Sequence, residues 1–315
     1  MFWTGPAFRR RRLACAAAAT ALALFIHCFV GCASVKKAAE APKKIARLDF
    51  IGGKYKNRIG ILPFENNAGP NGRGFEEFLE HEMIQGLAES CDELILLNLS
   101  EPENFEAFQD LPRNAEGQID NLYLAQAGRQ MGLNAILAVR LVTVESYVET
   151  EGIFWFRDQV TFARVSVMAD LFDPCTGSKI LDASETRVVE VDTFGEEGGA
   201  PDSESVEDAL IEAADNLIES ICEAATDHRW AAFVIAVEGE KIILSTGSQS
   251  GLEPGERLDV FDSGKIIEGA GGYRFIRPGK KTGEIEISAV YPDRSVALVV
   301  SDGDILPGNV ARPLD

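Results

Sequence analysis

The chain has 315 residues, of which 46% are hydrophobic, 25% charged and 8% aromatic. This composition is typical of a globular protein and excludes collagen-like, disordered and multispanning membrane chains. Acidic residues outnumber basic ones by 50 to 30, which gives a formal net charge of −20. Such a protein repels phosphate backbones, and the sequence contains no stripe of basic and aromatic residues, so we expect no nucleic-acid partner.

Residues 1–31 are predicted to be a signal peptide. Four arginines, Arg9 to Arg12, precede an apolar run without charges at residues 13–30, which is the order of a secretory signal. The run is nearly long enough to cross a bilayer, so an uncleaved anchor is the alternative. Loss of a leader with four arginines and no acids would leave a net charge of about −24.

The end of this leader, Phe29-Val30-Gly31-Cys32, resembles a bacterial lipobox, whose cysteine becomes lipidated. Cys32 is therefore the predicted lipidation site, and residues 32–57 are the predicted lipid anchor and tether. Residue 33 is alanine, whereas resemblance to lipoprotein sorting rules links aspartate there to inner-membrane retention. We expect a protein on the periplasmic face of the outer membrane, held by its lipid without spanning the bilayer.

Three cysteines follow Cys32: Cys91, Cys175 and Cys222. They allow at most one disulfide, with three pairings open, and three free thiols are the alternative. His81 and His228 are the histidines after the leader, and no Cys-x-x-Cys is present. The sequence therefore gives no support for a metal site, and we expect no cofactor.

Residues 58–228 alternate short apolar runs with helical patterns. The predicted elements are a strand at 58–63, a turn segment at 65–74, helices at 75–90 and 122–131, strands at 94–99, 135–147, 160–172 and 179–191, and a last helix capped by Ser205. The sequence Asp173-Pro-Cys-Thr-Gly177 predicts a hairpin turn. This order predicts an α/β (α+β) domain, a mixed sheet with packed helices.

Residues 229–315 lack helical periodicity. Short apolar runs at 231–237, 241–244, 282–291 and 295–300 are separated by glycine-containing turns, a pattern typical of many short strands. We therefore predict a second domain, a small all-β barrel or sandwich.

Three phrases of the first domain, at residues 58–67, 128–137 and 171–177, are similar to the α/β domain shared by TolB N-terminal, CsgG and LpoB proteins. In the second domain, residues 247–260, 282–287 and 306–310 resemble the C-terminal domain of FlgT-like lipoproteins. The resemblance implies a non-catalytic assembly module of an envelope machine, either flagellar-ring-like, secretion or cell-wall-associated. It implies envelope protein partners, and a homo-oligomer is an open alternative.

The loop Gly72-Arg73-Gly74 is a candidate anion site. It ends the glycine-rich segment Gly69–Gly74 between a predicted strand and a predicted helix, where backbone N–H groups can bind an anion. It lacks the Gly-Lys-Ser/Thr ending of a nucleotide loop, and a plain connecting loop is the alternative. An exported small-ligand receptor or enzyme using this loop is the rival function.

Phe154, Trp155 and Phe156 fall at the predicted turn between two long strands, where polar residues are usual. They either cover one end of the sheet or form a partner contact.

A CsgG-like secretion channel would need lipid-facing alternation on long strands. Residues 135–144 are instead apolar on both faces up to Arg140, as in a buried strand. The sequence shows no catalytic arrangement, so we expect no enzyme.

Overall fold

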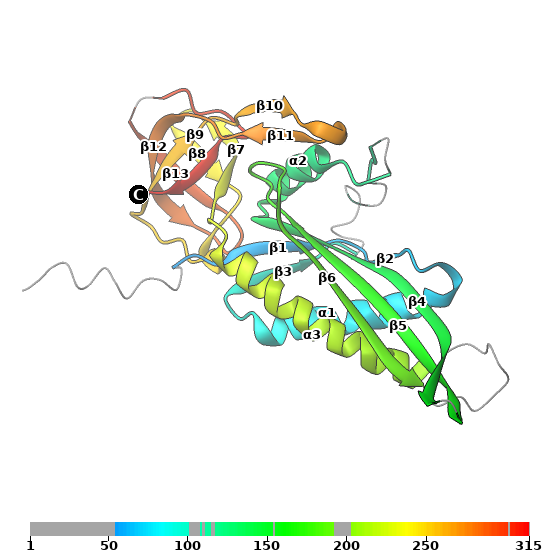
Figure 1. Cartoon of the computed structure of the whole chain (residues 1–315). Helices are drawn as coiled ribbons and strands as arrows, with labels where there is room; N and C mark the ends of the chain where they lie inside the picture. Colours follow the sequence, from blue (N-terminus) through cyan, green and yellow to red (C-terminus); the bar gives the residue numbers. More distant parts are fainter. Residues whose placement is uncertain are drawn as a thin grey trace, which may run out of the picture. The chain divides into compact units, whose positions relative to one another are not determined.

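We describe a computed structural model of the chain (Figure 1). The structure describes residues 54–100, 108, 111–114, 117–153, 155–191, 203–301 and 303–314. Every element below belongs to one compact unit, Gly52–Asp315. The predicted signal peptide and Cys32 lie outside the described residues. Among the described residues, none of the helices has the length and apolar character needed to span a membrane.

A six-stranded mixed sheet is built from the first half of the unit. Five strands run in the order β3-β1-β4-β5-β6, and the short β2 also pairs with β4. Their bounds are β1 Asn57–Ile61, β2 Glu65–Asn66, β3 Leu94–Asn98, β4 Ala135–Ile153, β5 Phe156–Phe172 and β6 Lys179–Val191. Strand β1 is parallel to β3 and β4, whereas β4, β5 and β6 are antiparallel neighbours. The predicted mixed sheet is confirmed.

Helices cover both faces of this sheet. The helices α1 (Phe75–Ser90) and α3 (Ser203–Asp227) pack on one face through apolar residues of β4 and β5. The short α2 (Asn121–Met131) packs on alternate residues of β4, such as Ile136, and therefore lies on the opposite face (Figure 1). Burial of this apolar surface on both sides is the main stabilising term of the fold.

Three expected element boundaries were wrong. Helix α3 begins at Ser203, so Ser205 lies inside its first turn and is not its cap. The acidic Glu204 favours the earlier start, because a carboxylate near a helix N-terminus is stabilised by the helix dipole. Strand β4 also runs past its predicted end at 147 to Ile153, and β5 begins at Phe156 instead of 160, because polar residues in both stretches hide the strand pattern from a search for apolar residues.

The extra length of β4 and β5 forms a two-stranded ribbon. Strand β6 ends at Val191 opposite Thr161, whereas β4 and β5 continue pairing from Glu149↔Val160 to Ile153↔Phe156. Figure 1 shows this ribbon projecting beyond the rest of the sheet. Ladder hydrogen bonds rather than a buried face hold it together, which is a marginal arrangement for an isolated hairpin.

Six antiparallel strands form a closed barrel in the order β12-β13-β8-β7-β14-β9. Their bounds are β7 Ala232–Glu238, β8 Lys241–Leu244, β9 Arg257–Phe261, β12 Lys281–Val290, β13 Ser295–Ser301 and β14 Val310–Pro313. Inward side chains such as Ile242, Leu258 and Ile285 fill its centre. The prediction of a small all-β barrel is thus confirmed. A side chain on Gly247 would collide with the Tyr291 carbonyl, which accounts for one glycine of the 247–260 phrase.

A hairpin that the sequence did not reveal packs against α2. Strands β10 (Lys265–Glu268) and β11 (Arg274–Arg277) pair only with each other. The Asn121 Nδ2 donates hydrogen bonds to the carbonyl oxygens of Arg274 at 2.6 Å and Gly177 at 2.8 Å. Ile276 packs on Leu122 and Ala125 of the helix. These contacts cross the predicted domain boundary at 228/229, and independent folding of residues 229–315 stays a prediction.

Short 3₁₀ turns lie in three loops, at Gly69–Gly72, Ser248–Ser250 and Ala270–Gly272. The first described residues are held on the barrel. The Tyr55 ring stacks on Trp230 with 4.5 Å between centroids, and the Lys56 N–H donates to the Ser250 carbonyl at 3.1 Å. Lys54 forms an ion pair with Glu256. The chain therefore touches the barrel before it enters β1.

One disulfide joins Cys91 and Cys222, with their Cα atoms 5.6 Å apart. It links the residue after α1 to the C-terminal half of α3. Cys175 is free and buried. The structure thus selects one of the three pairings that the sequence left open.

Candidate functional site

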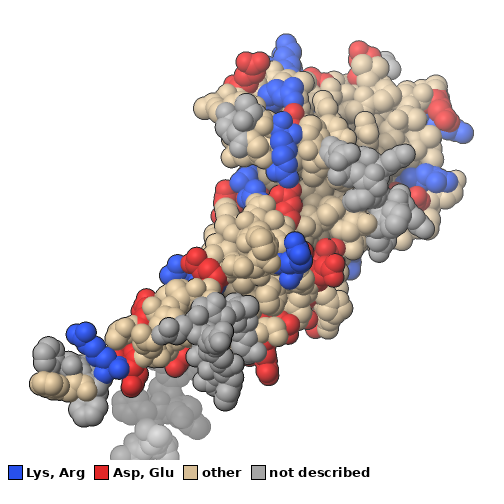
Figure 2. Space-filling view, turned by 90° about the vertical axis from the view of Figure 1, so that its right-hand side faces the viewer, with Lys and Arg blue, Asp and Glu red and all other residues tan. Residues whose placement is uncertain are grey.

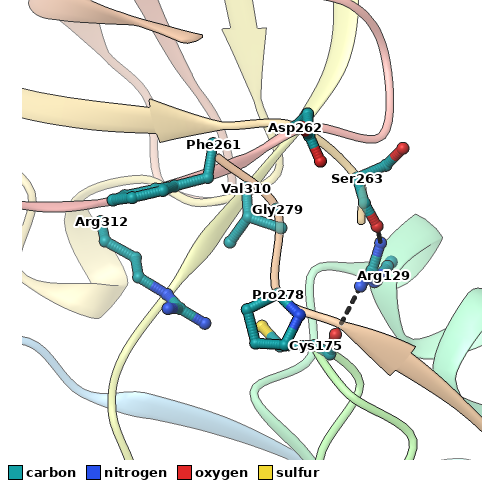
Figure 3. Close-up of a pocket in the computed structure, with 9 residues that line it drawn as sticks. All are labelled: Arg129, Cys175, Phe261, Asp262, Ser263, Pro278, Gly279, Val310 and Arg312. Carbon is teal, nitrogen blue, oxygen red and sulfur yellow. Dashed lines mark hydrogen bonds between the residues drawn. The ribbon is translucent and has the colours of Figure 1, made fainter. Parts of the chain in front are cut away.

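A cavity of about 90 Å³ lies where the α/β elements meet the barrel (Figure 3). Arg129 near the end of α2 and Cys175 in the turn after β5 line it from one side. Phe261, which ends β9, and Arg312 of β14 line it from the other. The cavity is small, but it brings two guanidinium groups and a thiol together from three separate parts of the sequence.

Arg129 is fixed by backbone carbonyls from both sides of the cavity. Its Nε donates to the Pro174 carbonyl at 2.8 Å, and its terminal nitrogens donate to those of Cys175 at 2.5 Å and Ser263 at 3.1 Å. The guanidinium also lies over the Phe233 ring, 5.9 Å from its centroid. Three of its five N–H groups are therefore occupied, and its position is well defined.

Arg312 is less constrained. It lies on the outward side of β14 with Val310, and its guanidinium carbon is 5.9 Å from the Phe261 ring centroid. Its Nε is buried and has no hydrogen-bond acceptor within the described part of the chain. Figure 3 shows the side chain reaching across the cavity toward Cys175 and Pro278.

Burial and neighbouring charges set the protonation of this region. Burial, and then the Asp173 carboxylate, raise the pKa of Cys175 to about 11, although both arginines oppose the rise. The thiol is therefore protonated at neutral pH and is a poor nucleophile. Burial also lowers the pKa of Arg129. The positive charge of Arg312 acts in the same direction, whereas the interactions with Cys175 and Asp173 act in the opposite direction.

The turn that carries Cys175 is held by Asp173. Its carboxylate accepts hydrogen bonds from the Cys175 backbone N–H at 2.7 Å and the Thr176 hydroxyl at 2.6 Å, and His228 Nε2 lies 3.4 Å away. Burial favours the neutral acid, but the interaction with His228 and the hydrogen bonds from Thr176 and Cys175 outweigh it and lower the pKa of Asp173. The turn predicted from Asp173 to Gly177 is thus a fixed wall of the cavity.

A second depression of about 300 Å³ surrounds the disulfide. Its charged lining is acidic and comprises Asp92, Glu93, Glu223 and Asp227. Within the described ranges no group of three His, Cys, Asp or Glu side chains is arranged to hold a metal ion. We assign no ligand to this depression.

The predicted anion loop lines neither cavity. Gly72 is buried, Gly74 adopts a left-handed conformation with φ of 89°, and Arg73 is exposed between them. Helix α1 starts at Phe75 and carries Glu76 and Glu77 in its first turn. These carboxylates already occupy the positive end of the helix dipole and would repel a bound anion.

Of the three aromatic residues predicted to contact a partner, Trp155 is the one whose side chain the structure describes. This side chain exposes 84% of its surface at the end of the ribbon. Phe154 and the side chain of Phe156 lie outside the described residues. Next to the ribbon, where β5 still pairs with β6, Tyr147 stacks on Phe162 with 5.8 Å between centroids, and the Arg164 guanidinium lies 4.8 Å from the Tyr147 centroid. On the face drawn in Figure 2, basic and acidic side chains are interspersed.

The cavity lined by Arg129, Cys175, Phe261 and Arg312, called the junction cavity below, could not be predicted from the sequence. Arg129 and Arg312 are 183 positions apart, and the sequence around each of them would equally suit an arginine on a solvated surface. The one local signal is the turn Asp173–Gly177, which we predicted as a turn and not as a cavity wall. A site of this kind depends on how β14 and α2 meet in space.

No protein-family model matches the chain, and no curated protein matches it. Solved structures similar to it include the hypothetical protein CT253 from Chlamydia trachomatis, with 12% identity over 54% of this chain and 98% of that chain and a TM-score of 0.37. Another is the lipoprotein GNA1162 from Neisseria meningitidis, with 15% identity over 52% of this chain and 99% of that chain and a TM-score of 0.30. A third is the PelC dodecamer from Paraburkholderia phytofirmans, with 9% identity over 55% of this chain and 89% of that chain and a TM-score of 0.32. At these scores the similarities carry no argument about function.

Proposed function

We propose that the protein is a non-catalytic interaction module, anchored by a lipid on the periplasmic face of the outer membrane. The observation that carries the proposal is the β4–β5 ribbon, which leaves the sheet and presents Trp155 with 84% of its surface exposed. A projecting ribbon adds little to the core, and a large exposed aromatic side chain is typical of an interface anchor. The partner is an envelope protein, consistent with the FlgT-like sequence phrases.

The membrane attachment rests on the leader and on Cys32. The Cys91–Cys222 disulfide supports export, because disulfides persist in oxidising compartments. The finer assignment, to a flagellar-ring-like, secretion or cell-wall-associated machine, rests on the sequence resemblance alone.

The lipid anchor is tested by labelling cells with a palmitate analogue. We expect label on the wild type and on Cys28→Ser, whose substitution lies inside the leader, and none on Cys32→Ser. An unlabelled wild type would refute the anchor and, with it, the outer-membrane location.

The interaction surface is tested with Trp155→Ala. Because the side chain is so exposed, its loss should change the free energy of unfolding by less than about 0.5 kcal/mol. Removal of an interface anchor should cost about 2 kcal/mol or more of binding, roughly a 30-fold loss of affinity. The matched control is Tyr291→Ala on the barrel, a residue that is 46% exposed.

The readouts are melting temperature and the recovery of cross-linked envelope protein. Full recovery with Trp155→Ala, or equal loss with Tyr291→Ala, would contradict the assignment of the ribbon. A large drop in melting temperature would show that Trp155 covers the sheet end, and the proposed partner contact would then be wrong.

A further inference from the structure

Two arginines face the junction cavity without a carboxylate partner. Several other arginines of this acidic chain form ion pairs, such as Arg140 with Asp170 at 2.6 Å and Arg164 with Glu145 at 2.7 Å. Within the described residues neither Arg129 nor Arg312 lies in such a pair. Like charges that share a partly buried cavity repel each other, and a negative group between them removes that repulsion.

The donors of the cavity are already in place. Three carbonyls hold the Arg129 guanidinium, and its other two N–H groups have no acceptor among the described residues. The Nε of Arg312 is buried without an acceptor in the described ranges, and the Cys175 thiol in the same cavity wall is only a weak acceptor. A ligand with oxygen acceptors would therefore meet prearranged donors from both sides.

One acidic residue, Asp262, also lines the cavity, and its carboxylate accepts hydrogen bonds from the backbone. The Asp262 carboxylate accepts hydrogen bonds from the backbone N–H groups of Gly264 at 2.8 Å and Lys280 at 3.2 Å. Asp173 is likewise engaged by the turn around Cys175. The lining thus holds two guanidinium groups and one carboxylate, so its net charge is positive, in a protein whose net charge is −20.

From this geometry we propose that the junction cavity is a binding site for a small oxyanion, a carboxylate or an inorganic phosphate, held by Arg129 and Arg312. A volume of about 90 Å³ exceeds what a single water needs and admits only a small ligand. Planar guanidinium groups are suited to bidentate contacts with such anions. The site is separate from the Trp155 surface and does not depend on it.

The ligand would join two parts of the fold. Arg129 and Cys175 belong to the α/β elements, whereas Arg312 and Phe261 belong to the barrel. A bound oxyanion therefore stabilises the contact between them and raises the melting temperature of the whole unit.

The experiment is titration calorimetry on the full chain in detergent, with sodium phosphate and sodium acetate as separate probes at constant ionic strength. We expect saturable binding of at least one probe to the wild type, weakened about tenfold or more in Arg312→Gln, because a hydrogen bond to a charged group is lost. The control is Arg294→Gln, an exposed barrel arginine over the Tyr291 ring at 5.1 Å, which should bind as the wild type does.

Binding of one probe alone supports the site and tells carboxylate from phosphate. If Arg312→Gln fails to fold, Arg312→Lys retains the charge and should still bind, though more weakly than the wild type. No saturable binding to the wild type, unchanged affinity in Arg312→Gln, or equal weakening in Arg294→Gln would overturn the proposal. Chloride binding as tightly as both probes would also overturn it, because it would show an unselective charge effect.

Discussion

Removal of the Cys91–Cys222 disulfide should destabilise the protein strongly. The bond joins residues separated by 131 positions, and the loop-entropy relation for that length gives about 5 kcal/mol at 25 °C. Measured effects usually fall below this relation, because the reduced unfolded chain retains some structure, so we expect a loss of about 3–5 kcal/mol. The cross-link acts mainly by limiting the conformations of the unfolded chain.

The assay is urea unfolding of the double variant Cys91→Ala/Cys222→Ala beside the wild type. The control is Cys175→Ala, which removes a buried sulfur without breaking a cross-link and so measures the packing cost of that change. A double variant within about 1 kcal/mol of this control would refute the reasoning. A wild type that contains three free thiols by mass would refute the pairing itself.

Two further predictions concern acid stability and the barrel. Because the folded pKa of Asp173 lies below its ordinary 3.8, its stabilising effect is complete above pH 3.8 and is lost as the pH falls through the folded value. Asp173→Asn should therefore cost about 1–3 kcal/mol at pH 7 and flatten the acid limb of a stability–pH curve, and an unchanged limb would contradict this. Residues 229–315 should fold alone with dispersed amide signals, although signals of Ile276 should shift because its contact with α2 is lost. A collapsed spectrum would contradict an independent barrel.

Elements with a buried face were predictable from the sequence. The stripe of α3, with Val206, Leu210 and Leu217, is buried as its spacing indicates, because helical periodicity reports directly which side meets the core. The order of strands and helices in the first half followed for the same reason. The closed barrel was predictable as a class, from short runs and glycine turns, but its strand order was not.

The features that escaped prediction depend on contacts between distant residues. The β10–β11 hairpin has exposed Ile266 and Ile267, so its pattern resembles a loop until α2 is placed beside it. The disulfide pairing could not be chosen from spacing, since three thiols allow three pairs. The junction cavity is the extreme case, because no single segment contains two of its charged groups.

The contact of Tyr55 with Trp230 has a mechanical consequence. A force applied to the chain before Lys54 reaches the aromatic stack and the Lys56–Ser250 hydrogen bond before it reaches β1, which begins at Asn57. The barrel therefore takes up tension first, and β1, held between two parallel neighbours, is shielded until that contact gives way. The stack of Tyr55 on Trp230 thus protects the sheet from force applied to the preceding chain.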